Sequence, residues 1–112
     1  MASKDPKLRP ITIKSGVLKR CSKEKLMYQK EAVDQEARIE RMKQEGKDEY
    51  DIKKQHEVLG ESMMMIPDCD KRIKAAYHEL KNLLDAQTDA EVLASKEVKE
   101  ALELLEANVP AT

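Results

Sequence analysis

The chain has 112 residues, of which 38% are charged and 3% are aromatic, and its formal net charge is −1. With only three Gly, four Pro and no Trp or Phe, it lacks the aromatic and turn residues from which large β-sandwiches and doubly wound sheets are built. The near-zero net charge gives no indication of a nucleic acid or an acidic substrate as a partner. Abundant Lys, Glu, Ala and Leu instead predict long helices within one small domain.

The two cysteines, Cys21 and Cys69, form no CxxC motif and no metal-binding array. Separate thiols in a chain whose first residues show no apolar signal-peptide region are typical of the reducing cytosol. No apolar run approaches the roughly 20 residues that a membrane span requires. We therefore expect a soluble, cytoplasmic protein that does not enter a membrane.

The first predicted helix extends over about residues 11–45, after a flexible N-terminal arm of residues 1–10 that ends at Pro10. Residues spaced alternately by three and four form a seam along this helix, and seven of the ten are apolar or aromatic. Such a seam is typical of an amphipathic helix. The seam consists of Ile11, Lys14, Leu18, Cys21, Lys25, Tyr28, Ala32, Gln35, Ile39 and Met42.

Gly46 and Asp48 predict a short turn before a second helix at about residues 49–86. Glycine adopts the left-handed conformation that ends many helices, and aspartate is a favourable N-cap residue. Because the turn is short, the second helix should run antiparallel to the first. Its predicted seam consists of Ile52, His56, Leu59, Met63, Ile66, Asp70, Ile73, Tyr77, Leu80 and Leu84.

Pro67 lies in the middle of the second predicted helix. Proline lacks a backbone donor and crowds the carbonyl four residues earlier, here that of Met63, so it kinks or ends a helix. Ile66 and Ile73 keep the seven-residue step of the seam across the proline. This continuity favours one helix kinked at Pro67 over two separate helices.

A third helix is predicted at about residues 89–107, followed by a C-terminal tail of residues 108–112. Thr88 and Glu91 have the spacing of a capping box at its start. Three helices with short links predict an all-α fold, namely an elongated antiparallel three-helix bundle that forms a single domain over residues 11–107. The seam of the third helix consists of Ala94, Val98, Ala101 and Leu105.

The sequence shows no catalytic constellation. His56 and His78 belong to no HExxH motif, and the three glycines are too scattered to build a phosphate-binding loop. His56 falls on the predicted seam, where a hydrogen-bonded packing role is expected. We therefore expect no enzyme activity, no metal site and no cofactor. The basic run before Tyr28 is not interleaved with other aromatic residues, so we expect no nucleic acid as a partner.

Some apolar residues face away from the predicted seams. At about 100° per residue, Leu26, Val33 and Ala37 lie roughly opposite the seam of the first helix. Met64 likewise points away from Ile66 on the second helix. Methionine suits a surface that adapts to a varied or non-native partner, so together these residues favour an interaction module. The alternative is scattered surface apolarity or a broad three-helix core.

Two stretches of the second predicted helix are similar to a known family. They are YDIKKQ at residues 50–55 and MMIPDC at residues 64–69, with Glu57, Leu59 and Glu61-Ser62 between them. These residues closely resemble tubulin-binding cofactor A, and the likeness extends over roughly residues 8–105. Further matches in the first helix are Ile13-Lys14, Gly16-Val17, Lys19-Arg20, Lys23-Glu24-Lys25, Met27-Tyr28 and Lys30-Glu31-Ala32.

The resemblance implies a function as well as a fold. Members of this family are expected to be three-helix rods that capture β-tubulin folding intermediates after the cytosolic chaperonin. They would pass these intermediates to the other tubulin-folding cofactors for assembly of the α/β-tubulin heterodimer, without binding nucleotide. The resemblance thus implies a cytoplasmic, cytoskeleton-associated chaperone. Members vary between monomer and dimer, so a homodimer is possible. Met63 departs from the family pattern, in which a basic residue is expected.

Matching the motif residue by residue, we expect β-tubulin to contact the second helix around Pro67 and the basic part of the first helix. Pro67 would bow the rod and curve the surface offered to the client. For each charged residue the alternative is a solvated position that contributes little by itself. The expected contact residues are Lys19, Arg20, Lys23, Lys53, Lys54, Glu57, Glu61, Met64 and Asp68. Residues expected to be structural are Tyr28, Tyr50, Ile52, Leu59 and Ile66.

A second function class fits the same periodicity. In this alternative the chain is a generic helical oligomerisation or adaptor module whose outward stripe around Leu26 and Val33 pairs with another copy. Both functions need amphipathic helices, so the helical pattern does not separate them. The stretch at residues 50–69 favours the tubulin chaperone.

Overall fold

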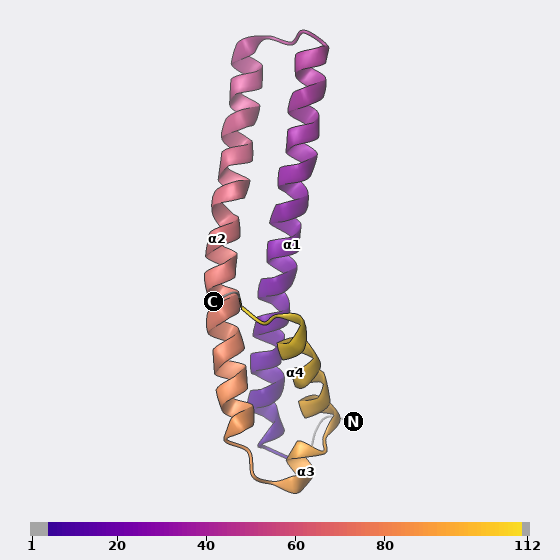
Figure 1. The fold of residues 1–112 in the computed structure, drawn as a ribbon, viewed down its shortest axis with the longest axis vertical. Helices are drawn as coiled ribbons and strands as arrows, with labels where there is room; N and C mark the ends of the chain where they lie inside the picture. Colours follow the sequence, from indigo (N-terminus) through magenta and orange to yellow (C-terminus); the bar gives the residue numbers. More distant parts are fainter. Residues whose placement is uncertain (1–4, 111–112) are drawn as a thin grey trace. The chain divides into compact units, whose positions relative to one another are not determined.

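The computed structural model describes residues 5–110, and the helices in this range are connected by turns without any strand. The elements are α1 (Leu8–Gln44), α2 (Glu49–Asp85), α3 (Ala90–Leu93) and α4 (Lys96–Ala107) (Figure 1). The fold is therefore all-helical, as expected from the composition. Within the described range, none of the helices combines the length and the apolar composition that crossing a membrane requires.

Helix α1 begins earlier than predicted. The backbone N–H of Lys7 donates to the Asp5 carboxylate at 2.9 Å, and the N–H of Leu8 donates to the Asp5 carbonyl at 3.0 Å. The first turn then includes Pro10, whose missing N–H would have no helical partner at this position in any case. The expected flexible arm over residues 1–10 is thus wrong for residues 8–10, and residues 1–4 lie outside the described part.

The turn between α1 and α2 follows the expected chemistry. Gly46 has a φ of 68°, and its N–H donates to the Lys43 carbonyl at 3.1 Å while the N–H of Lys47 donates to the Met42 carbonyl at 3.0 Å. These two bonds form a Schellman motif, which satisfies the last carbonyls of α1. Asp48 then precedes α2, and its carbonyl accepts the first helical bond, from the N–H of Ile52 at 3.1 Å.

Helix α2 continues through Pro67 without interruption, so the prediction of one helix rather than two is confirmed. Its buried face departs from the predicted seam at His56, Met63 and Asp70, all of which are exposed. Cys69, next to the predicted seam position, is instead 0% exposed. The predicted seam and the observed inner face share every seventh residue, such as Leu59 and Ile66. Between these shared positions, the structure turns inward the residue that precedes each predicted one, so that Ser62 and Cys69 take the places of Met63 and Asp70.

The third predicted helix is divided in two. Ser95 has an extended conformation (φ −73°, ψ 158°) that interrupts the helical backbone between α3 and α4. Its hydroxyl donates to the Val92 carbonyl at 2.6 Å and accepts from the Val98 N–H at 3.2 Å. Because serine competes with helical hydrogen bonds in this way, it caps α4 rather than continuing α3. The prediction of one helix over residues 89–107 was therefore wrong.

The cap of α3 also differs from the predicted one. Asp89, not Thr88, is the N-cap residue, and its carboxylate accepts hydrogen bonds from the N–H groups of Glu91 at 2.9 Å and Val92 at 3.4 Å. Aspartate is at least as good an N-cap residue as threonine. The predicted capping box of Thr88 and Glu91 was one residue too early.

The chain divides into two compact units, and α1 and α2 contribute to both. Unit 1 contains the chain up to Ser22 and from Lys71 onward, and unit 2 contains Lys23–Asp70. Unit 1 has a continuous apolar core, to which all four helices contribute. Its buried members are Leu8, Ile11, Leu18, Ala76, Leu80, Leu84, Val92, Val98, Ala101 and Leu105.

Unit 2 is a helical hairpin of the second part of α1 and the first part of α2. Ala32 and Ile39 are its buried apolar residues on α1, at 6% and 4% exposed. Polar contacts supplement them, because the Gln35 amide donates to the backbone carbonyl of Gln55 at 3.2 Å and to its side-chain oxygen at 2.5 Å. All ten predicted seam residues of α1 are buried or half-buried, so the seam predicted for this helix is confirmed.

Candidate partner-binding site

The candidate residues on α2 occupy one exposed face of unit 2. Five of them follow one another at spacings of four, four, three and four, which places them within an arc of about 80° on a helix. This arc lies opposite the half-buried residues Leu59 and Ile66. All six candidates are exposed in the structure; they are Lys53, Lys54, Glu57, Glu61, Met64 and Asp68.

Unit 2 holds this face in place by contacts on its other side. The Lys25 ammonium pairs with the Asp70 carboxylate at 2.6 Å, and the Lys25 side chain is only 30% exposed. This ion pair joins the start of the unit to its end, within two residues of both Lys23 and Asp68. Together with the hydrogen bonds that the Gln35 amide donates to the backbone carbonyl and the side-chain oxygen of Gln55, it fixes how α1 and α2 are paired in the hairpin.

One candidate lysine has an ordered environment of its own. The ammonium of Lys54 lies 5.3 Å from the centre of the Tyr50 ring, in a cation–π contact one turn along the helix. Tyr50 was expected to be structural, but it is 61% exposed and does not belong to the core. Its ring instead supports Lys54, which reduces the freedom that a long lysine side chain would lose on binding a partner.

Large apolar side chains lie exposed on both helices of unit 2. Met64 is 75% exposed and Met63 is 52% exposed on α2, while Leu26 and Val33 are each 65% exposed on α1. The predicted outward orientation of Leu26, Val33 and Met64 is therefore confirmed. Exposed apolar residues interspersed with charged ones can offer a partner an adaptable apolar contact with a polar surround.

The basic candidates on α1 are divided between the two units. Lys23 belongs to unit 2 with the α2 candidates, whereas Lys19 and Arg20 belong to unit 1. All three are exposed. The structure thus brings Lys23 into the same compact unit as the six residues of α2, and it places Lys19 beside a different feature, a groove in unit 1.

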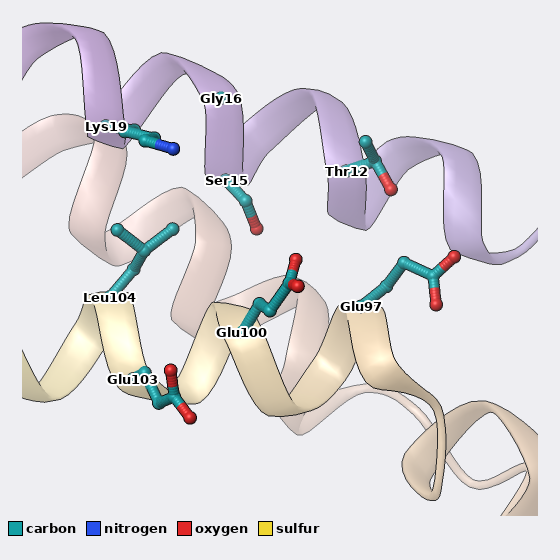
Figure 2. A pocket seen from close by; sticks show the side chains of 8 residues that line it. All are labelled: Thr12, Ser15, Gly16, Lys19, Glu97, Glu100, Glu103 and Leu104. Atoms are coloured by element: carbon teal, nitrogen blue, oxygen red, sulfur yellow. The ribbon is translucent and has the colours of Figure 1, made fainter.

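The groove lies between the first part of α1 and α4, and its volume is about 450 Å³. Figure 2 shows that the amine of Lys19, the hydroxyl of Ser15 and the carboxylate of Glu100 point into the space between the two helices. Glu97 points toward α1 near Thr12, and Glu103 points away from α1 (Figure 2). Thr12, Ser15, Gly16, Lys19, Glu97, Glu100, Glu103 and Leu104 line the groove.

The groove was not predicted from the sequence. The only available signal was the spacing of Glu97, Glu100 and Glu103, which places acidic residues on one side of α4. Among the described residues, the Ser15 hydroxyl in the groove is buried and has no hydrogen-bond partner. Within residues 5–110, no group of three or more His, Cys, Asp or Glu side chains is placed to hold a metal ion.

An ion pair connects the start of the chain to the cap of α3 within unit 1. The Lys7 ammonium donates to the Asp89 carboxylate at 3.0 Å. This hydrogen bond, followed by those from the N–H groups of Glu91 and Val92, lowers the pKa of Asp89 below its ordinary value. The same contact raises the pKa of Lys7. Asp89 is thus a cap and an ion-pair partner at once.

The chain is similar to known proteins over most of its length. The family described as tubulin binding cofactor A matches residues 6–105. Tubulin-specific chaperone A of Gallus gallus is 53% identical over 102 residues, covering 91% of this chain and 93% of that protein. Tubulin-specific chaperone A of Homo sapiens is 54% identical over 97 residues, covering 87% and 88% of the two chains.

Solved structures show the same relationship. The structure of human tubulin chaperone cofactor a has a TM-score of 0.74 at 47% identity and covers 91% of this chain and 97% of its own. The crystal structure of tubulin folding cofactor A from Arabidopsis thaliana has a TM-score of 0.81 at 38% identity, covering 90% and 94%. The family match over residues 6–105, the sequence identity and the shared helical fold lead to one conclusion: the chain belongs to the tubulin binding cofactor A family.

Proposed function

We propose that this protein is a tubulin-folding chaperone whose client is β-tubulin. The observation that carries the proposal is its identity of more than half to relatives named tubulin-specific chaperone A, over nearly the full length of both chains. In this function it captures β-tubulin folding intermediates downstream of the cytosolic chaperonin. It passes them to the other tubulin-folding cofactors, so that the α/β-tubulin heterodimer assembles.

The exposed face of α2 is the proposed contact surface. A partly folded β-tubulin exposes apolar surface that is covered in the heterodimer, and Met64, which is 75% exposed, offers a flexible apolar side chain to it. The surrounding charged residues of α2, with Lys23 of α1, form the polar rim within unit 2. Lys19 and Arg20, which belong to unit 1, are proposed as further β-tubulin contacts. Binding of the intermediate removes it from the aggregation-prone pool by mass action, which stabilises it without any chemical step.

The same proposal defines what the protein does not need. We propose that it acts without catalysis, cofactor, metal ion or nucleotide, and that it works in the cytoplasm in association with the cytoskeleton. Neither a nucleic acid nor a membrane is part of the proposed activity. The homodimer that the family resemblance implies is not part of this proposal.

We also propose a finer description of the fold. The two long helices and the third helical region form an elongated antiparallel three-helix bundle, and α2 bends at Pro67. The motivation is the missing backbone donor of Pro67 inside a continuous helix. A bend at this point would curve the face that carries Glu61, Met64 and Asp68.

Charge reversal on α2 tests the proposed contact surface. The double substitution Lys53→Glu/Lys54→Glu should weaken capture of purified β-tubulin about 5- to 10-fold, because two favourable rim charges become unfavourable. The matched control is Lys74→Glu/Lys99→Glu, which makes the same charge change at exposed positions of unit 1, away from the candidate residues. Capture is measured by native gel shift or fluorescence titration, with circular dichroism to verify the helix content.

The possible results distinguish an error in the proposed contact surface from an error in the proposed function. Unchanged capture by the Lys53→Glu/Lys54→Glu variant would move the contact surface away from this part of α2. If the folded wild-type chain fails to bind β-tubulin at micromolar concentrations, the proposed function itself is wrong.

A further inference from the structure

The three tyrosines of the chain differ in their exposure to solvent. Tyr28 and Tyr77 are half-buried, and Tyr77 packs against the core of unit 1. Tyr50 is instead 61% exposed, and its hydroxyl makes no hydrogen bond to any other residue in the range 5–110. The phenol oxygen of Tyr50 is therefore open to chemistry from outside the molecule.

The segment around Tyr50 is also accessible to an enzyme. Tyr50 is the second residue of α2, and the N–H groups in the first turn of a helix have no helical acceptor. The first one bonded here is that of Ile52, which donates to the Asp48 carbonyl at 3.1 Å. Opening this segment therefore breaks few bonds. The acidic residues Asp48, Glu49 and Asp51 flank the tyrosine, and protein kinases select substrates partly by such charge patterns.

Two lysines lie on the same side of α2 as Tyr50. Lys53 and Lys54 follow it by three and four residues, the spacings at which side chains on a helix face each other. The Lys54 ammonium is 5.3 Å from the centre of the tyrosine ring. Neither lysine makes an ion pair within the described part of the chain. Glu49 and Asp51 are adjacent in sequence, so they project to either side and do not face Tyr50.

From the exposure of this tyrosine and the two unpaired lysines beside it, we propose that Tyr50 is a phosphorylation site and that its phosphate pairs with Lys53 and Lys54. The phosphoryl donor is a nucleoside triphosphate held by a protein tyrosine kinase. The phenol oxygen attacks the γ-phosphorus, a new P–O bond forms, and the bond to the bridging β-phosphate oxygen breaks, so that nucleoside diphosphate leaves. The phenol proton passes to the catalytic aspartate of the kinase.

The modification changes the charge of the proposed contact surface. A phosphotyrosine carries a charge of about −1.5 to −2 at pH 7, which offsets the two lysine charges beside it. Lys53 and Lys54 would then be engaged within α2 and no longer available to a partner. Phosphorylation of Tyr50 therefore weakens the capture of β-tubulin, and this consequence rests on the proposed function. The modification site itself does not depend on the identity of the client.

Mapping of the modified residue tests the site. The full chain is incubated with magnesium, ATP and each of a small set of tyrosine kinase catalytic domains, and the products are located by mass spectrometry. Tyr50 should be modified about tenfold faster than Tyr28 and Tyr77, because these two become accessible only when the helices they pack on open. Equal rates at the three tyrosines, or no kinase that modifies Tyr50, would overturn the proposal.

Thermal denaturation tests the pairing with the lysines. At low salt, phosphorylation of Tyr50 should raise the Tm of the wild-type chain by about 2–4 °C, since the phosphate is attracted to both lysines and to the first turn of α2. In Lys53→Gln/Lys54→Gln the rise should be about half as large or smaller, because only the attraction to the first turn remains. An unchanged Tm, or an equal rise in both proteins, refutes the ion pairs.

Titration with β-tubulin tests the consequence for capture. The phosphorylated chain should bind purified β-tubulin about 5- to 10-fold more weakly than the unmodified chain. Kinase treatment should not change the binding by Tyr50→Phe, which keeps the ring but has no phenol oxygen to modify. Equal capture by the phosphorylated and unmodified chains refutes the regulation. An unmodified chain that does not bind β-tubulin refutes the proposed function and this regulation with it, whereas the mapping and the Tm measurements still decide the modification site.

Discussion

Two glycines of this chain should respond in opposite ways to the same substitution. Gly60 lies well inside α2, and a Cβ atom added there would have no neighbouring atom within 4 Å. Alanine is favoured over glycine in a helix interior by about 1 kcal/mol, since glycine loses more backbone freedom on folding. Because nothing obstructs the added methyl group, Gly60→Ala should raise the free energy of unfolding by about 1 kcal/mol.

Gly46 provides the matched comparison. A Cβ atom there would also have no neighbour within 4 Å, but the backbone φ of Gly46 is +68°. Residues other than glycine rarely adopt this backbone conformation, and forcing alanine into it costs about 1–2 kcal/mol. Gly46→Ala should therefore lower the free energy of unfolding by about 1 kcal/mol, although the space around the two glycines is equally open.

Chemical and thermal denaturation followed by circular dichroism measures both effects. For a chain of this size, about 1 kcal/mol corresponds to a shift in Tm of about 4–6 °C, upward for Gly60→Ala and downward for Gly46→Ala. Both variants make the same chemical change, so the difference between their Tm shifts measures the effect of the backbone conformation at the two positions. A Gly60→Ala variant that unfolds at a lower temperature than wild type would refute the assignment of Gly60 to an unobstructed helix interior.

Two further predictions concern the ion pair of unit 1 and the proline of α2. The pKa of Asp89 is lowered in the folded state, so its contribution to stability is present above the unfolded value of about 3.9 and is lost as the pH falls through the lower folded value. Asp89→Asn, which can still cap α3, should therefore show a flatter loss of stability below about pH 4 in urea denaturation; an unchanged acid profile would contradict this role. Pro67→Ala restores a backbone donor inside α2 and should raise the free energy of unfolding by about 1–2 kcal/mol and straighten the helix; a lower Tm would argue against a simple kink.

The sequence pattern predicts much of this fold because the long helices have strong and regular signals. On α1, residues such as Ile11, Leu18 and Ile39 repeat over many turns, and the whole predicted seam is buried or half-buried in the structure. The Schellman turn was equally predictable, because Gly46 is the only glycine between the two long helices and a positive φ requires it.

The errors occur where two local solutions have similar free energies. Thr88 and Asp89 are both good N-cap residues, and a helix start can differ by one residue at little cost. Ser95 could have continued a helix with its side chain in solvent, but it caps α4 instead and divides the predicted third helix. The groove lined by Lys19 and the glutamates of α4 depends on how α4 packs on α1, which periodicity within one helix does not describe.

The shift of the α2 seam explains why the candidate face is apolar as well as charged. The predicted seam would have placed Met63 inside, and the structure half-buries Ser62 and buries Cys69 instead. Ser62 and Cys69 thus share the inner face of α2 with the half-buried Leu59 and Ile66. As a consequence, Met63 is 52% exposed and lies beside Met64, which is 75% exposed, as predicted. The helix thus turns Leu59, Ile66 and smaller residues inward and leaves the flexible side chains of Met63 and Met64 available to a partner.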